Sequence, residues 1–113
     1  MPAPARAELQ QALSDLRLAA EVLKTYDAAV AERLGAAIAK HMATVKAASG
    51  LTGETARQHA RVVGHMEAIV GCLERVKKYP VMMAGRADLL DRSAGLAKMC
   101  RLLLARLAPP ASQ

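Results

Sequence analysis

The sequence predicts an all-α protein, an antiparallel helical bundle, and three observations support it. Alanine and leucine dominate the chain, and isoleucine occurs only at positions 38 and 69, a composition that favours helix over strand. Strong chain breakers gather at two internal places, 49–53 and 79–85. Between them, apolar residues recur at the three- and four-residue spacing of one helix face. We predict a single helical domain over 1–113, with helices at about 5–48, 52–78 and 87–108 and loose termini at 1–4 and 109–113.

The first predicted helix carries an apolar stripe along its whole length. From Leu9 to Val45 the apolar positions advance by about 3.6 residues on average, the period of a straight amphipathic helix. Asp27 is charged but lies in register, and the stretch 24–27 contains neither Gly nor Pro. We therefore expect an unbroken helix of about 66 Å, which makes a three-helix bundle with a long first helix. The alternative is a break near Thr25–Asp27, which makes a four-helix bundle.

The second and third predicted helices have clear end signals. Thr52 is a suitable N-cap for the second helix, and Pro80 prevents that helix from continuing. The third helix begins between Pro80 and Asp88 and ends near Ala108. The loop at 49–53 lets the first and second helices pair antiparallel.

Small residues repeat at every fourth position on both helices that flank this loop. Small side chains let two helix axes approach closely, which compensates for a core without Phe or Trp. We expect the closest packing where the two stripes meet, at Gly35, Ala39, Gly64 and Ala68.

The apolar face of residues 5–24 is left uncovered if the first helix stays whole. A third helix that returns beside the second reaches only the later part of the first, and an apolar stripe of this kind indicates an interface. We expect a homo-oligomer, most simply a dimer, or a complex with a different protein. Two methionines beside Pro80 form a second adaptable surface. The predicted contact residues are Leu9, Leu13, Leu16, Val22, Leu23, Met82 and Met83.

The net charge of +6 is concentrated in the last third of the chain. Residues 1–74 carry equal numbers of acidic and basic side chains, so the excess arises after them. A one-sided field attracts anions, including nucleic acid, although the absence of a dense Lys/Arg run also fits mere solubility. The candidate anion or nucleic-acid contacts are Arg75, Lys77, Lys78, Lys98, Arg101 and Arg106.

No pattern in the sequence indicates catalysis, a metal site or a cofactor. His59 and His65 stand about 240° apart around a helix, so they cannot chelate one metal. Cys72 and Cys100 occupy apolar positions and are expected to be buried and reduced, as in a cytoplasmic protein. No apolar stretch approaches the roughly 18 residues of a membrane span, so no membrane association is expected.

We therefore expect a small cytoplasmic protein–protein interaction module, not an enzyme, that acts as an adaptor, chaperone or regulator through apolar helix packing. The alternative is a nucleic-acid-associated oligomeric subunit, for packaging or architecture, that uses its basic C-terminal face. No small-molecule substrate is expected in either case.

Overall fold

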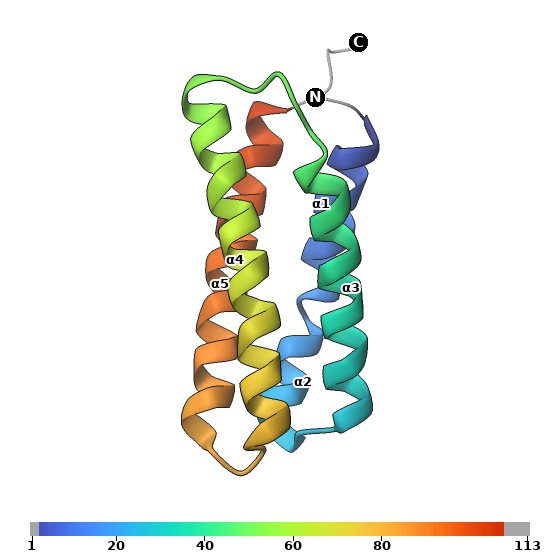
Figure 1. Cartoon of the computed structure of the whole chain (residues 1–113), viewed down its shortest axis with the longest axis vertical. Coiled ribbons are helices and arrows are strands. Elements are labelled where there is room, and N and C mark those ends of the chain that lie inside the picture. Colours follow the sequence, from blue (N-terminus) through green and yellow to red (C-terminus); the bar gives the residue numbers. More distant parts are fainter. Residues whose placement is uncertain (1–2, 108–113) are drawn as a thin grey trace.

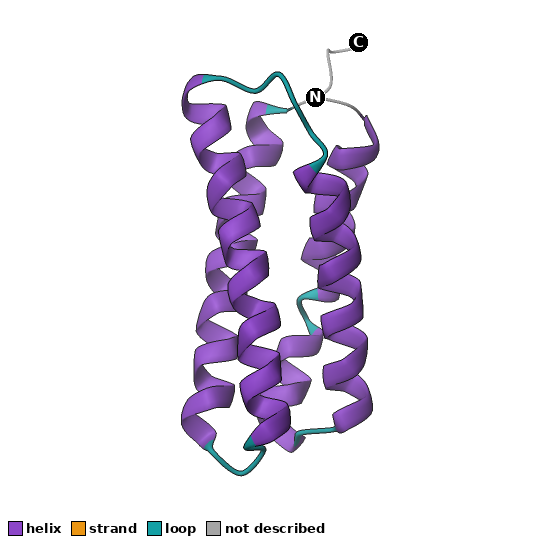
Figure 2. Ribbon diagram, viewed as in Figure 1, coloured by secondary structure: helices purple, strands orange, loops and turns teal. Residues whose placement is uncertain are grey.

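Helices alone make up the regular structure of residues 3–107, the part of the chain that the computed structural model describes (Figures 1 and 2). The molecule is an elongated bundle of 48 × 23 × 19 Å, as expected of an all-α antiparallel bundle. Helices α1 and α2 follow one another along one column, and α3, α4 and α5 form the other three (Figure 1). The helices are α1 (Ala3–Asp15), α2 (Leu18–Thr25), α3 (Ala28–Lys46), α4 (Gly53–Lys78) and α5 (Met83–Arg106).

The prediction of an unbroken first helix is wrong, and the structure shows the alternative, a break near Thr25–Asp27. At Tyr26 the backbone takes φ 33°, in the left-handed region, and the chain reverses direction there. The Asp27 carboxylate then accepts a hydrogen bond of 2.8 Å from the Ala29 N–H and caps the start of α3. The charge that interrupts the apolar stripe is thus the N-cap of a new helix.

A second, milder interruption separates α1 from α2. The N–H of Ala19 bonds to the carbonyl of Leu16 at 3.0 Å, and that of Ala20 bonds to the carbonyl of Arg17 at 3.2 Å. These are the three-residue hydrogen bonds of a tighter turn, so the column bends without reversing.

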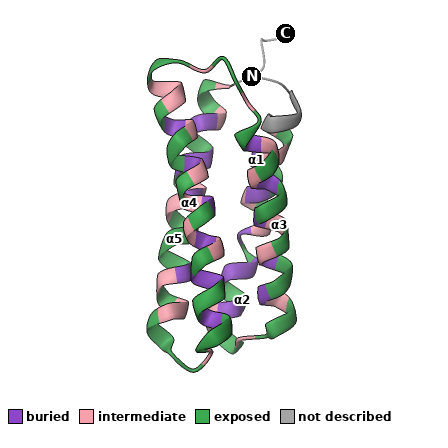
Figure 3. Cartoon of the chain, viewed as in Figure 1, coloured by how far each residue is buried: buried purple, intermediate pink, exposed green. Residues whose placement is uncertain are grey.

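The reversal at Tyr26 buries the leucine stripe inside this chain. Leu9 and Val22 are 0% exposed and Leu16 is 7% exposed, while Leu13 and Leu23 are half-buried. Figure 3 shows buried residues along both α1 and α2. Both α1 and α2 pack on α3 and on α5. Burying one such side chain stabilises a fold by about 1.5–3 kcal/mol, whereas one residue at positive φ costs about 1–2 kcal/mol. Burial therefore outweighs the strained corner, and the predicted interface at residues 5–24 is core.

The α3–α4 pair is antiparallel, as predicted, but large side chains form most of its seam. Ile38 on α3 and Met66 on α4 are fully buried. A Cβ on Gly35 would stand 3.5 Å from Leu73, an ordinary contact, whereas a Cβ on Gly64 would meet nothing within 4 Å.

Of the other two small residues expected in the seam, Ala39 is exposed and Ala68 is half-buried. The close approach expected at Ala39 and Gly64 is therefore wrong. A stripe that repeats every fourth residue winds about 40° per step, so it leaves the interface that the 3.6-residue pattern keeps.

The ends of the later helices lie close to their predicted positions. Helix α4 begins at Gly53, one residue after the predicted start, and ends at residue 78 as predicted. Helix α5 begins at Met83, earlier than the expected residue 87. Ala3 and Pro4 belong to the first turn of α1, so they are not loose. The expectations for residues 1–2 and 108–113 fall outside the described residues.

Side chains from other helices hold three helix C-termini. Arg6 on α1 donates to the carbonyls of Leu104 and Leu107 at the end of α5, both at 3.1 Å. Arg86 on α5 donates to the carbonyl of Leu23 in the last turn of α2 at 3.3 Å. The last carbonyls of a helix lack partners within it and carry a partial negative charge, so basic side chains stabilise these ends. The third such contact joins His59 Nε2 to the carbonyl of Val45 at 2.7 Å, at the end of α3.

Candidate functional site

The turn between α4 and α5 carries the most exposed of the large apolar side chains on the described surface. Pro80 ends α4, and the chain turns before α5 begins at Met83. A hollow of about 410 Å³ beside the turn is lined by Arg75, Tyr79, Met82, Ala84 and Gly85. We call the exposed set the α4–α5 tip: it consists of Tyr79, Val81, Met82 and Met83, exposed by 50%, 84%, 54% and 57%. The exposure expected for Met82 and Met83 is found here.

Met82 occupies the N-cap position of α5, where an apolar residue is unfavourable. Its side chain makes no capping hydrogen bond. Asp, Asn, Ser or Thr at an N-cap stabilises a helix by about 0.5–2 kcal/mol relative to a residue that cannot cap. The tip thus keeps a methionine at a position where a polar side chain would be more stable.

The cations predicted at the end of α4 are mostly paired. Arg75 lies 2.6 Å from the Asp88 carboxylate, which raises the pKa of the guanidinium above its usual value. Lys77 lies 3.1 Å from Glu32. Lys78 instead places its ammonium 5.6 Å from the centre of the Tyr79 ring, a cation–π contact at the tip.

The six predicted anion contacts do not form one surface. Arg75, Lys77 and Lys78 lie near the α4–α5 turn, whereas the range 98–106 lies on the half of α5 that runs to the opposite end (Figure 1). All of Lys98, Arg101 and Arg106 are exposed there.

Two further arginines, which were not among the predicted contacts, join the cations at that end. A hydrogen bond from Arg57, with the nearby charges of Arg106 and Arg61, holds the pKa of Glu54 below its usual range. Both Arg57 and Arg61 belong to the first turns of α4, beside the end of α5. The antiparallel pairing of these two helices could have predicted both arginines, because it places the start of α4 beside the end of α5.

A buried histidine lies between two carboxylates at the α1–α3 contact. His41 is 3% exposed; its Nδ1 lies 2.5 Å from Glu8 and its Nε2 lies 2.7 Å from Asp15. Each ring nitrogen therefore lies within hydrogen-bond distance of a carboxylate oxygen, one from the middle of α1 and one from its end. Burial raises the pKa of Asp15, but hydrogen bonds from His41 and Gln11 outweigh it and hold that pKa below its usual value.

This Glu8–His41–Asp15 cluster is a structural clasp. Both ring nitrogens are occupied, so neither is left to ligate a metal or to move a substrate proton. No local sequence pattern reveals these partners, because Glu8 and Asp15 lie 33 and 26 positions from His41. Only the reversal at Tyr26 brings α1 back beside α3.

Both cysteines are free and buried, as predicted. Burial and a hydrogen bond to Asp88 raise the pKa of the Cys72 thiol, which also accepts a hydrogen bond from Arg75. Burial raises the pKa of Cys100 to about 12. Neither thiol is ionised at neutral pH, so neither is an activated nucleophile.

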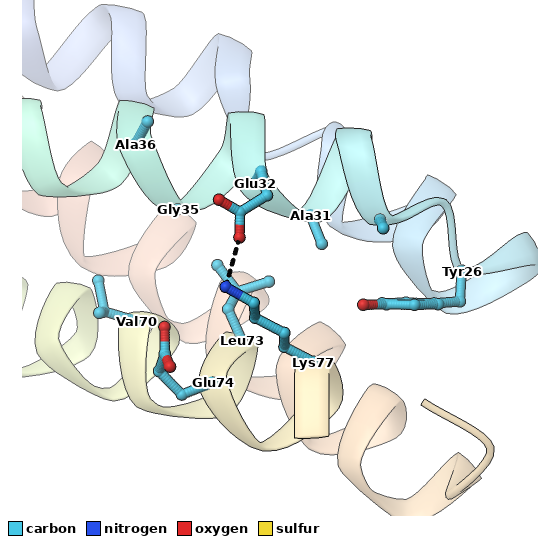
Figure 4. A pocket seen from close by; sticks show the side chains of 10 residues that line it. Tyr26, Ala31, Glu32, Gly35, Ala36, Val70, Leu73, Glu74 and Lys77 are labelled. Carbon is cyan, nitrogen blue, oxygen red and sulfur yellow. Dashed lines mark ion pairs between the residues drawn. The ribbon is translucent and has the colours of Figure 1, made fainter. Parts of the chain in front are cut away.

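A groove of about 440 Å³ runs between α3 and α4 near the corner at Tyr26 (Figure 4). The small residues of the α3 stripe, including Ala31 and Gly35, line it where a tight seam was expected. The Lys77 ammonium crosses from α4 to Glu32, and the hydrogen bond to that carboxylate raises the pKa of Lys77. The hydroxyl of Tyr26 points into the groove from one end (Figure 4).

Within residues 3–107, no three His, Cys, Asp or Glu side chains converge in a way that would hold a metal ion. Among the helices of the same residues, none has a stretch both long and apolar enough to cross a bilayer. No protein family, curated protein or solved structure matches this chain.

Proposed function

We propose that this chain is a protein–protein interaction module that binds its partner through the α4–α5 tip. The observation that supports the proposal is the exposure of four large apolar side chains in one turn. Elsewhere on the described surface the only exposed large apolar side chains are Leu90 and Leu102, at 39% and 41%. Contiguous exposed apolar residues are typical of interaction sites, whereas scattered ones are not.

The partner that fits this tip is a helical segment with apolar and acidic side chains. Methionine is flexible and polarisable, so Met82 and Met83 can adapt to different apolar shapes. The 410 Å³ hollow offers space for an apolar side chain of the partner. The net charge of +6 and the Lys78 ammonium at the tip favour an acidic ligand.

Charge also makes a heterologous partner more favourable than a second copy. Two tips brought face to face would place their Lys78 ammonium groups close together, and like charges disfavour such contacts. The leucine stripe on which the dimer expectation rested is buried within the chain. We therefore propose an adaptor, chaperone or regulator that binds a different protein.

The same proposal includes two further properties: the protein has no catalytic activity, and it is located in the cytoplasm. The clasp occupies both nitrogens of His41, and both buried thiols are protonated, so these groups are suited to stability and not to chemistry. Two free cysteines fit a reducing compartment.

The test is binding of a dye-labelled amphipathic helix of leucines and glutamates, measured by fluorescence anisotropy. Val81→Asp places a like charge against the acidic ligand and should weaken binding at least tenfold. Leu102→Asp is the matched control, because Leu102 is also exposed but lies toward the other end of α5. Retained binding in the Val81 variant, or equal loss in both, would contradict the proposal.

A second candidate function, nucleic-acid binding, is supported by the cations that gather at the opposite end of the bundle. There the start of α4 and the end of α5 contribute Arg57, Arg61, Lys98, Arg101 and Arg106. Binding led by phosphate contacts weakens steeply as salt rises. A gel shift with duplex DNA at low and moderate salt tests it, and absence of a shift at low salt would exclude it.

A further inference from the structure

The α3–α4 groove has an apolar floor that none of the described side chains fills. On the α3 side its lining residues carry at most one side-chain carbon, apart from Glu32, as at Ala31 and Gly35. On the α4 side Val70 and Leu73 form the floor. Its volume of about 440 Å³ lies within the range of small-molecule pockets, about 300–1,000 Å³.

The polar groups of the groove leave one negative charge in excess, although the protein as a whole is strongly basic. Two carboxylates, Glu32 and Glu74, line it together with one ammonium, Lys77. Glu32 and Lys77 pair with one another at 3.1 Å. No ion pair or hydrogen bond joins the Glu74 carboxylate to any residue within 3–107. A cation is therefore the complementary ligand.

Tyr26 closes the groove at the end away from Glu74 (Figure 4). Its backbone stands at φ 33°, a conformation that glycine or asparagine would adopt with less strain. The ring is half-buried, and its hydroxyl is directed along the groove. Strain held at a residue that lines a cavity is a common feature of binding sites.

We propose that the α3–α4 groove binds an alkylammonium group, a short apolar chain that ends in a protonated amine. The ammonium lies against Glu74, and the chain runs over Leu73, beneath the Glu32–Lys77 pair, toward the ring of Tyr26. The same chemistry occurs in a free aliphatic amine and in a lysine side chain of a peptide. The site is separate from the α4–α5 tip and does not depend on it.

The two tyrosines of this Trp-free chain provide a direct readout. In the Tyr79→Phe variant, Tyr26 is the sole tyrosine, so intrinsic fluorescence reports the groove alone. We expect hexylamine, protonated at neutral pH, to change this fluorescence saturably, with half-saturation on the order of millimolar. Hexanol should bind at least fivefold more weakly, and hexanoate should give no saturable change. An equal response to hexanol would overturn the proposal.

Substitutions on the same background locate the ligand. Ala36 is exposed and lines the groove, so Ala36→Leu should fill it and abolish the response without disturbing the core. Ala39→Leu, on the same helix and also exposed but outside the groove, is the matched control. Glu74→Gln should weaken binding by roughly fivefold, the effect of one exposed charge. Unchanged binding in the Ala36 variant would place the ligand elsewhere and overturn the assignment.

An acetylated, amidated tripeptide with one central lysine distinguishes the two sources of the ligand. Tighter binding of the peptide than of hexylamine identifies a protein lysine as the ligand, and the reverse order identifies a free amine. Binding of either, with the same sensitivity to Ala36→Leu, supports the site, whereas failure of both would overturn it.

Discussion

His41 Nε2 lies 2.7 Å from Asp15 Oδ2, across the contact between α3 and α1. The other ring nitrogen meets Glu8, which stands two helical turns before Asp15 on the same face of α1. One imidazole ring therefore holds α1 at two levels. Because a ring that is hydrogen-bonded on both sides tolerates little sliding, the clasp sets the position of α1 along α3.

Replacing His41 by Ala should destabilise the protein by about 1–3 kcal/mol, because two partly buried carboxylates lose their donors. Urea unfolding followed by circular dichroism measures the change in the free energy of unfolding. Asp15→Asn and the double variant complete a mutant cycle. Additive effects within about 0.5 kcal/mol would show that the two residues do not act together.

The lowered pKa of Asp15 predicts a stability loss in acid. When the folded-state pKa is below the unfolded value, the unfolded state binds more protons, so stability falls as pH falls. The contribution is fully present above the ordinary value of 3.8 and is lost as pH drops through the lower folded pKa. Urea midpoints measured from pH 6 into this range should fall less steeply for Asp15→Asn than for the unmodified chain. Parallel curves would contradict the prediction.

Met82→Asp should stabilise the fold while weakening partner binding. An aspartate at the N-cap of α5 can accept a backbone hydrogen bond that methionine cannot, which is worth about 1 kcal/mol. Thermal unfolding should shift upward by about 4–8 °C for a domain of this size. The same variant should bind the acidic helical peptide more weakly, because the charge opposes the ligand. Met83→Asp is the control, since it alters the tip without reaching the N-cap position.

Gly64→Ala should stabilise the protein by about 0.5–1 kcal/mol, because the position is helical and a Cβ there meets nothing within 4 Å. A close helix seam at this glycine would make the same substitution destabilising. Gly50→Ala is the contrast: its surroundings are equally open, but its φ of 78° makes an alanine strained. Denaturant midpoints of the two variants should therefore move in opposite directions.

Much of the fold was accessible from local signals, and the corner at Tyr26 was not. Pro80 and Thr52 mark real helix ends. The missing N–H of Pro80 acts over a few residues, and Thr52 occupies the N-cap position of α4, where its side chain makes no capping hydrogen bond. The corner contains neither Gly nor Pro, and its only local sign is Asp27, which reads equally well as a charge within a continuous stripe. The free energy that favours the corner comes from burying leucines against helices far along the chain. A local sequence pattern carries no information about such distant contacts.

The candidate sites divide in the same way. Exposure at Met82 follows from its neighbouring proline and was predictable. The partners of His41 come beside it only because the chain reverses at Tyr26. Arg57 and Arg61 lie near the cations at the end of α5 only because α4 packs on α5. The α3–α4 groove lies where a small-residue stripe suggested contact, because the stripe leaves the interface as it winds.

The C-termini of α2, α3 and α5 are each held by a side chain that another helix supplies. None of these three helices therefore has its C-terminal carbonyls satisfied in the same way in isolation. Loss of α1 would remove Arg6 and let the far end of α5 fray, and loss of α5 would do the same to α2. A chain built in this way gains little from partial folding, so we expect it to unfold in a single cooperative step.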